Sequence, residues 1–399
     1  MSHERHVSIG VRIAEVRKLR GLTQLVLARR ANVSYSLLRK VESGERPASH
    51  SLVSAVARAM SVGVVDLTDQ PYGSRNAEPK SEQAGVPALR QALVEGDDPE
   101  LDTRPLSLQE LTTAVAELKA WDRRTKHAEV VRALPNVLRH LHHARNELPT
   151  AERPRANELL SAAYANAVVS LYRLGHLDLA HLADERARTA AERGDDPLRI
   201  ATSEWNHALI QLFDGSYRGG LRSISRANTH VDLAPKSAAA MSVRGALHLR
   251  AAILAARTGD TDRADDYLDA ADSCVAPRQE QANHYSTKFS AANVDIHRVA
   301  IPVELSDGTT AVSRAASIQL PATTAPSRSG HYFIDLSRAW LLHGDRTKAL
   351  ESLHRARKIA PQLTRYHPQV HETVHALAIS DVRSTDTLAG FAAWCGIRS

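Results

Sequence analysis

Residues 9–47 read IGVRIAEVRKLRGLTQLVLARRANVSYSLLRKVESGERP and determine the fold of the N-terminal part of this 399-residue chain. Apolar residues recur in this stretch at the spacing of helix faces. Thr23 and Ser34 are suitable N-caps for a second and a third helix, because a hydroxyl oxygen accepts a hydrogen bond from a free backbone N–H. Asn32 tolerates the left-handed backbone of a tight turn between those helices. The stretch therefore predicts a helix-turn-helix.

A small bundle is expected to continue after Pro47. The apolar residues of a fourth helix are Leu52, Val53, Val56, Ala57 and Met60, again at helical spacing. A last short helix is expected at residues 64–67. The sequence thus predicts an N-terminal domain of five helices at residues 1–69.

The net charge of the chain is concentrated in its N-terminal part. Residues 1–80 contain 13 Lys and Arg against 7 Asp and Glu, whereas residues 81–399 contain 38 of each kind. The whole net charge of +6 therefore lies in the segment with the helix-turn-helix pattern. A basic segment favours polyanions, because its cations neutralise phosphates and release counterions.

The motifs LRGLTQ (19–24), ARRANVSYSLL (28–38) and VESGERP (41–47) resemble the lambda-repressor-like, or XRE, family of helix-turn-helix domains. Such domains place the start of their recognition helix in the major groove of double-stranded DNA. The resemblance implies that Gln24 holds a phosphate or a base edge, that Tyr35, Ser36 and Lys40 read base edges with Arg39 beside them, and that Ser34 and Ser43 contact the DNA backbone. It also implies a structural ion pair between Arg17 and Glu42.

Some of these side chains have a simpler alternative role. Tyr35 either packs on a base or sugar or only shields the turn, and Arg39 and Lys40 either contact DNA or form a solvated face. Leu25 and Val26 depart from the family pattern, which has polar residues there. They either dock on a partner surface or the C-terminal domain, or are two isolated exposed apolar residues.

The composition predicts an all-α protein. Aromatic residues make up only 4% of the chain, and Ala, Leu and Arg, which are strong helix formers, fill many positions. Cys274 and Cys395 lie in no CxxC spacing and fit a reducing cytosol. Neither a signal peptide nor a membrane-spanning run is evident, so we expect a soluble cytoplasmic protein, nucleoid-associated when DNA-bound, with no membrane partner.

A linker is expected at residues 70–105. Its first part, QPYGSRNAEPKSEQAGVP (70–87), is rich in Pro, Gly, Ser and charged residues. A short helix is expected at residues 88–94, followed by a second break at residues 96–105. Such a tether lets two N-terminal domains reach neighbouring half-sites while their bodies dimerise elsewhere.

Residues 106–399 repeat a pattern in which a glycine is followed by small residues at offsets of five and then seven. The copies are Gly175, Ala180, Ala187; Gly215, Gly220, Ala227; Gly259, Ala264, Ala271; and Gly344, Ala349, Ala356. Glycine lets the chain turn between antiparallel helices, and small residues let those helices approach closely. The pattern resembles tetratricopeptide repeats and predicts an α-solenoid. Degenerate copies are expected at residues 108–148 and 279–321, where Ile301-Pro302 interrupts the helix and Gly308 makes the turn.

The first helix of each pair is expected to line the concave wall of the solenoid. The positions nine residues before each turn glycine are Asn166, Asn206, Arg250 and Asp335, and Asn293 takes that part in the degenerate copy. An asparagine amide both donates and accepts, and can therefore bond to the backbone of an extended peptide. The alternative is that these polar residues simply face water in a groove.

Catalytic motifs are weak in this chain. Residues 371–375 spell HETVH, the HExxH pattern of zinc proteases. No histidine follows it as a third ligand, and Asp381 or Asp386 is the only substitute, so packing or capping is the expected role of these histidines. We expect no enzyme activity, no metal and no cofactor.

The order of parts is similar to that of the RRNPP peptide-responsive quorum-sensing regulators. The resemblance implies a transcription regulator that homodimerises, binds an operator in double-stranded DNA and senses a short peptide or another small effector. A ligand that prefers one curvature of the solenoid would bias the spacing of the two DNA readers. The alternative is a regulator or adaptor whose repeats bind a partner protein instead.

Overall fold

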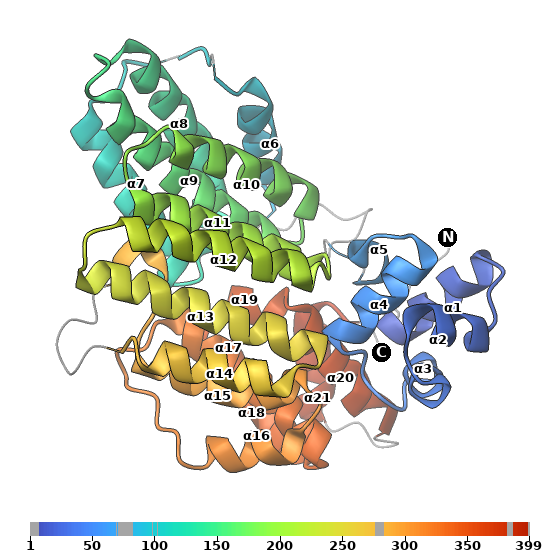
Figure 1. Ribbon diagram of the computed structural model, residues 1–399. Helices are drawn as coiled ribbons and strands as arrows, with labels where there is room; N and C mark the ends of the chain where they lie inside the picture. The colour runs from blue at the N-terminus through green and yellow to red at the C-terminus, as the bar shows by residue number, and fades with distance from the viewer. Residues whose placement is uncertain are drawn as a thin grey trace.

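Figure 1 shows a computed structural model that describes residues 8–68, 70, 83–97, 99–101, 103–275, 283–380 and 386–397. Every regular element in these ranges is a helix, as the sequence predicts. An N-terminal domain, formed by α1–α5, lies against one side of a larger helical body, formed by α6–α21. None of the described helices combines the length and the apolar character needed to cross a bilayer.

The N-terminal domain is the predicted bundle of five helices. They are α1 (Ile9–Leu19), α2 (Gln24–Ala31), α3 (Tyr35–Glu42), α4 (His50–Met60) and α5 (Val64–Thr68). The hydroxyls of Thr23 and Ser34 cap α2 and α3 by accepting from the backbone N–H groups of Val26 and Leu37. Asn32 adopts the left-handed conformation, with φ of 53°, at the turn between them. Fully buried side chains that fill the core include Ile13, Leu27, Leu38, Val56 and Leu67.

The helical body consists mainly of antiparallel helix pairs. They are α7 (Leu108–Arg123) with α8 (His127–Glu147), α9 (Arg153–Arg173) with α10 (Leu177–Glu192), α11 (Pro197–Phe213) with α12 (Tyr217–Leu233), α13 (Ala238–Thr258) with α14 (Thr261–Asp272), α15 (Ala291–Glu304) with α16 (Gly308–Ala315), and α17 (Pro326–His343) with α18 (Arg346–Ile359). A short 3-10 turn, η1 (His284–Ser286), precedes α15. The chain closes with α19 (Pro361–Arg365), α20 (Pro368–Ser380) and α21 (Asp386–Cys395).

The repeated glycines and small residues have the roles that the sequence predicts. Gly175, Gly215, Gly259 and Gly344 have positive φ angles between 72° and 101° in the turns between paired helices. A positive φ carries little steric cost only for glycine. The small residues that follow are buried where the paired helices meet: Ala180, Ala187, Gly220, Ala227, Ala264, Ala271, Ala349 and Ala356.

The second degenerate copy was predicted wrongly in two details. Pro302 does not interrupt a helix but lies in the last turn of α15, close to the point where that helix ends. The left-handed turn residue is Ser306, with φ of 64°, whereas Gly308 begins α16. A Cβ at Gly308 would lie 2.6 Å from the carbonyl oxygen of Ala339, so glycine is needed there for close helix packing. Residues 279–282 of this copy lie outside the described residues.

The expected linker differs from the structure in one respect. Residues 71–82, which form most of its first part, lie outside the described residues. The predicted short helix is present as α6 (Val86–Glu95), which begins two residues earlier than expected. This helix packs against the helical body, because Val86, Leu89 and Leu93 are buried in the same core as residues of α8. Its apolar face therefore belongs to the helical body.

Candidate DNA-binding face and ligand cavity

The solvent-facing side of α3 carries the polar residues predicted to contact DNA. Ser34, Tyr35, Ser36, Arg39, Lys40 and Ser43 are all exposed. The opposite side of α3 is held in the core by Leu38 and Val41. Figure 1 shows that α4, rather than α3, faces the ends of α12 and α13. The body therefore leaves the polar side of α3 uncovered.

Gln24 is half-buried and is held by neighbouring side chains. Its Nε2 donates to Glu42 Oε2 at 2.8 Å, and its Oε1 accepts a longer bond of 3.5 Å from the Tyr35 hydroxyl. Glu42 also receives two hydrogen bonds from Arg17, at 2.7 and 2.8 Å. This bond to Glu42 raises the pKa of the Arg17 guanidinium. The predicted internal ion pair thus exists and fixes both Gln24 and Tyr35 at the start of the candidate DNA-binding face.

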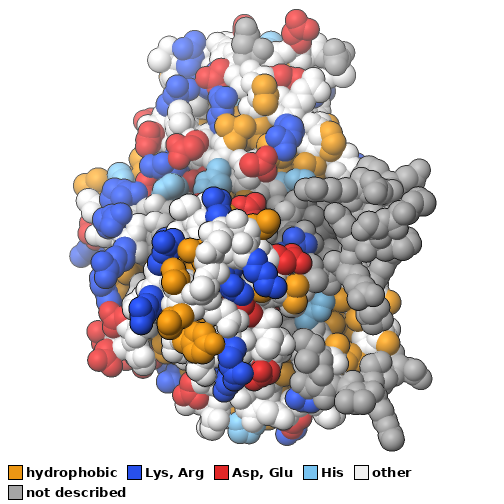
Figure 2. Space-filling model, turned by 90° about the vertical axis from the view of Figure 1, so that its right-hand side faces the viewer, with side chains coloured by type: hydrophobic (Ala, Val, Ile, Leu, Met, Phe, Trp, Pro, Cys, Tyr) orange, Lys and Arg blue, Asp and Glu red, His pale blue; other side chains and the backbone are white. Residues whose placement is uncertain are grey.

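The unusual apolar residues of α2 are exposed. Leu25 is 47% exposed and Val26 is 38% exposed, so neither docks on the helical body of the same chain. Figure 2 looks onto the side of the molecule that carries the N-terminal domain and shows Lys and Arg side chains gathered there among apolar ones. Arg29 and Arg30, which follow on α2, are exposed as well.

A cavity of about 210 Å³ lies inside the helical body. All five residues predicted to line the concave wall line this one cavity: Asn166, Asn206, Arg250, Asn293 and Asp335. They come from α9, α11, α13, α15 and α17, the first helices of five successive pairs. Placement at one common cavity follows because each first helix presents its corresponding face to the interior of the curved stack.

Neighbouring groups already contact three of these residues, two through hydrogen bonds and one through an aromatic ring. The Nδ2 of Asn166 donates to the carbonyl of Ala162 at 2.7 Å. Arg250 stacks over the Trp205 ring at 4.6 Å, and Asp335 accepts from Arg338 at 3.0 Å. The Oδ1 of Asn293, by contrast, is buried without a hydrogen-bond partner.

Most of the charge in this cavity lies on residues that were not predicted from the sequence to line it. Its walls include eight Lys and Arg side chains, which are Lys119, Arg173, Arg199, Arg250, Arg257, Lys288, Arg328 and Arg338. Only three acidic side chains face them, namely Asp122, Glu304 and Asp335. The cavity is therefore strongly cationic although residues 81–399 are neutral overall.

The N-terminal domain reaches the edge of the same cavity through α4. His50, its first residue, lines the cavity. The Ser51 hydroxyl donates to the carbonyl oxygen of Arg257 at 3.3 Å. Arg257 in turn forms a buried ion pair with Glu304 at 2.9 Å, and Glu304 also binds Arg338 at 2.9 Å. The ion pairs outweigh the cost of burial and hold the pKa of Glu304 far below its usual range.

Further bonds fasten α4 to the body. The Tyr217 hydroxyl donates to Ser54 Oγ at 3.0 Å, and Arg58 donates to the carbonyl oxygen of Gly215 at 2.7 Å. Gly215 packs so closely on α4 that a Cβ there would lie 2.4 Å from the Cβ of Ser54.

The HETVH segment lies on α20 and contacts the N-terminal domain. Glu372 is buried and accepts hydrogen bonds from the backbone N–H groups of Ile9 and Ala48, at 2.9 and 3.4 Å. Burial raises its pKa to about 7, while the two bonds oppose that shift. The ring of His371 bonds to the carbonyl of Arg365 at 2.8 Å. In the described part of the chain, the side chains of this motif do not converge with a third ligand as a metal site requires. Asp381 and the side chain of Asp386, the two alternatives for that ligand, lie outside the described residues.

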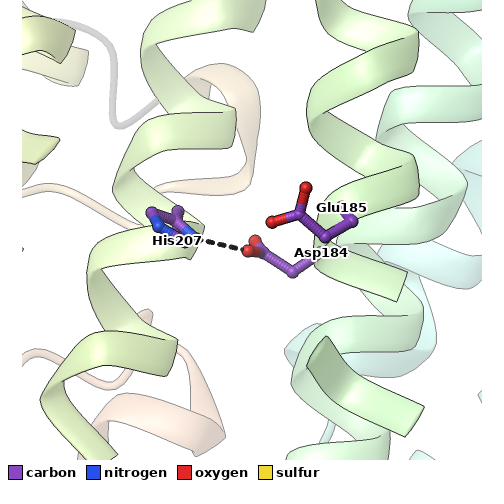
Figure 3. Close-up of side chains that lie close together, drawn as sticks. All are labelled: Asp184, Glu185 and His207. Carbon is purple, nitrogen blue, oxygen red and sulfur yellow. Dashed lines mark hydrogen bonds and ion pairs between the residues drawn. The ribbon is translucent and has the colours of Figure 1, made fainter. Parts of the chain in front are cut away.

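One other group of side chains has the spacing of metal ligands. Asp184 and Glu185 on α10 lie near His207 on α11, with their ligand atoms within 4.8 Å of one another (Figure 3). His207 Nδ1 already bonds to Asp184 at 2.6 Å, and Glu185 pairs with Arg188 at 3.2 Å. Burial raises the pKa of Asp184, which favours this hydrogen bond between neighbouring helices as the role of the group.

Known proteins resemble this chain in part of its sequence and, distantly, in its structure. Residues 13–67 match the family model described as helix-turn-helix. No curated protein sequence matches the chain. Among solved structures, PlcR of Bacillus thuringiensis in complex with the peptide PapR7 and DNA is 15% identical over 67% of this chain and 94% of that chain, with a TM-score of 0.29.

Two further solved structures are similarly distant. PrgX is 15% identical over 81% of this chain and 98% of its own, with a TM-score of 0.23. ComR from Streptococcus suis is 11% identical over 96% and 97%, with a TM-score of 0.20. These scores are too low to assign a function. The family match, together with the order of α1–α5, makes the N-terminal domain of this chain similar to helix-turn-helix DNA-binding domains.

Proposed function

We propose that this protein is a transcription regulator that binds an operator in double-stranded DNA through α3 and senses a ligand in the cavity of its helical body. The observation that carries the proposal is the position of His50, which belongs to the DNA-binding domain and also lines the cavity. A ligand that binds there differs in its contacts with the docked and undocked arrangements of that domain. Such a difference shifts the population of the two states.

The DNA-contact residues of the proposal are those of the exposed face. Arg39 and Lys40 supply the cationic contacts to phosphate or guanine, and Tyr35 and Ser36 lie nearest the start of α3, where base edges are read. Ser34 and Ser43 flank α3 and contact the DNA backbone, and Gln24 anchors the entry to the motif. Gln24 is pre-positioned by its bond to Glu42, so little side-chain entropy is lost on binding.

The ligand of the proposal is a short peptide. Asn166, Asn206 and Asn293 face one cavity from the inner helices α9, α11 and α15, and amide side chains can bond to both N–H and C=O groups of an extended backbone. Arg250 and Asp335 bring charges of both signs to the same walls. A cavity of about 210 Å³ within the helical body suits a peptide segment or a small molecule better than the surface of a folded partner protein.

Homodimerisation completes the proposal. A helix-turn-helix reads only one short half-site, and dimers gain affinity by binding two half-sites a whole number of helical turns apart.

Selection of bound sequences from a random double-stranded DNA pool by the full chain tests the DNA-binding part and the dimer together. We expect enriched sites to be palindromes with half-sites about one helical turn apart. A pool that shows no enrichment contradicts DNA reading, and enrichment of single half-sites contradicts the dimer.

A further inference from the structure

Three arginines in the cavity form no ion pair with the described carboxylates. Arg173 on α9, Arg250 on α13 and Arg328 on α17 all line the cavity and are half-buried. Within the described residues, none of them lies within 4.0 Å of a carboxylate oxygen. A buried charge normally has an ionic partner, because loss of hydration is costly.

The carboxylates of the cavity are already used by other cations. Asp122 pairs with Lys288, and Glu304 is shared by Arg257 and Arg338. Asp335 binds Arg338 at 3.0 Å. Every acidic side chain on the cavity wall therefore has a cationic partner that is not one of the three arginines.

The three guanidinium groups also act on one another. Burial, together with repulsion from Arg328 and Arg173, lowers the pKa of Arg250 to about 9. Burial likewise lowers the pKa of Arg328 to about 10, with repulsion from Arg173 as the next cause. Arginine side chains stay protonated at neutral pH, so the cavity holds repelling positive charges that a bound anion would relieve.

Unused hydrogen-bonding atoms lie beside these charges at the beginning of α17. The Nε of Arg328, the Oγ of Ser327 and the Nε2 of His331 are buried without a hydrogen-bond partner. Burial, with the nearby arginines, holds the pKa of His331 well below its usual range, so the ring is neutral and can donate one hydrogen bond. The positive end of the α17 helix dipole adds to the attraction for an anion.

Two of the guanidinium groups are held in place by aromatic rings. Arg250 stacks over Trp205 at 4.6 Å, and Arg173 lies over the Tyr172 ring at 5.1 Å. Stacking orients the guanidinium plane and leaves its N–H edge free for a planar or tetrahedral oxyanion.

We propose that Arg173, Arg250 and Arg328, with Ser327 and His331, form a subsite that binds an acidic group of the ligand, either a carboxylate or a phosphate. The inference rests on the ligand-binding role proposed above and adds to it the chemistry of one ligand group. Two oxygens of a carboxylate, or three of a phosphate, provide enough acceptors for the free N–H edges and the unpaired atoms.

The first test uses inorganic phosphate as the probe. Thermal unfolding of the full chain is followed while phosphate replaces chloride at constant ionic strength. We expect a saturable rise of Tm for the wild type, and an apparent affinity at least tenfold weaker for Arg250→Gln and Arg328→Gln. Arg222→Gln, which removes an exposed arginine of α12, is the matched control and should behave as the wild type. A non-saturable rise of equal size in all variants would show only a general salt effect and would overturn a phosphate subsite.

The second test separates the two sources of the acidic group. A random pool of short peptides with free carboxyl termini is compared with the same pool amidated at the C-terminus, and retained peptides are identified by mass spectrometry. Retention of free-acid peptides that is lost in Arg328→Gln assigns the subsite to a peptide carboxylate, whereas a phosphate response without such retention assigns it to a phosphate. If neither probe distinguishes the wild type from Arg328→Gln, the subsite does not exist.

Folding of the variants provides a separate check. Because burial and repulsion from Arg173 together outweigh the attraction of Asp335 and Asp122, Arg328→Gln should unfold at the same Tm as the wild type or higher when no anion is present. A Tm clearly below that of the wild type would contradict a net cost of the Arg328 charge. Operator binding by the same samples keeps the two proposals apart. Anion binding without DNA binding would contradict the proposed regulator function but support the anion subsite. DNA binding without any response to anions would support DNA binding and contradict the subsite.

Discussion

The carboxylate of Glu372 accepts a hydrogen bond of 2.9 Å from the backbone N–H of Ile9, a residue 363 positions earlier in the chain. Ile9 is the first residue of α1, where backbone N–H groups lack partners within the helix. A second bond, from the N–H of Ala48, lies close to the beginning of α4. One buried side chain of the helical body thus binds two segments of the N-terminal domain and fixes its orientation.

Replacement of Glu372 by Ala should loosen this attachment. The buried N–H groups of Ile9 and Ala48 would lose their acceptor, which costs about 1–3 kcal/mol for each buried group. We expect faster amide hydrogen exchange at the start of α1, and faster proteolysis between the N-terminal domain and the body. Glu351→Ala, at an exposed position of α18, is the control. Unchanged exchange at α1 would show that this contact does not hold the domain.

The pH dependence of stability should contain a contribution from Glu372. Its pKa is raised from 4.5 to about 7 in the folded chain, so between these values the folded state holds a proton that the unfolded state has released. Stability contributed by this group therefore falls as pH rises from about 5 to 8, by roughly 3 kcal/mol in total. Glu372→Gln removes the titration. The difference in unfolding free energy between the variant and the wild type should move in favour of the variant as pH rises, and a constant difference would contradict the raised pKa.

Gly215 offers a test of the contact between α4 and the body. Gly215→Ala places a Cβ 2.4 Å from that of Ser54, in addition to the strain of a positive φ. Gly259→Ala is a closely matched control, because Gly259 has a similar φ of 81° but no atom within 4 Å of an added Cβ. We expect the control to lose about 1 kcal/mol and Gly215→Ala to lose about 1–3 kcal/mol more. Equal losses by thermal unfolding would show that the α4 contact yields without cost.

Glu304 should be needed for the stability of the fold. Among the described residues it is the carboxylate that pairs with Arg257, and it also pairs with Arg338. Glu304→Gln leaves two buried guanidinium groups with too little negative charge, at a cost of about 3–5 kcal/mol. The measurement is the urea midpoint of unfolding, with Glu351→Gln, at an exposed position of α18, as a surface reference. A midpoint equal to that of the wild type would contradict a structural role for the ion-pair network.

The helices and their pairing could be predicted from the sequence, because they depend on interactions between residues close together in the chain. Caps at Thr23 and Ser34, the turn at Asn32 and the glycine-to-alanine spacing act within one or two helical turns, so the helices and their pairing follow directly. The positions nine residues before each turn glycine also reach one cavity, because the repeat fixes which helix face points inward.

The cationic character of the cavity was predictable but was missed. Arginines lie seven residues, or two helical turns, from four of the predicted wall positions and therefore share their helix face. These are Arg173 with Asn166, Arg199 with Asn206, Arg257 with Arg250, and Arg328 with Asp335. The role of Glu372 was beyond sequence reasoning, since its partners are backbone groups more than 320 residues away.

The most direct test of the account measures the affinity of the full chain for its selected operator over a series of salt concentrations. The comparison is between the wild type and the double variant Arg39→Ala, Lys40→Ala, with Arg222→Ala, Lys236→Ala as a control that removes the same two charges from exposed positions of the body. We predict that the α3 variant binds more weakly. The slope of its log affinity against log salt concentration should become shallower by about 1–2, since fewer phosphate contacts form and fewer counterions are released. Unchanged affinity and slope in the α3 variant would contradict the assignment of α3 as the DNA-reading helix.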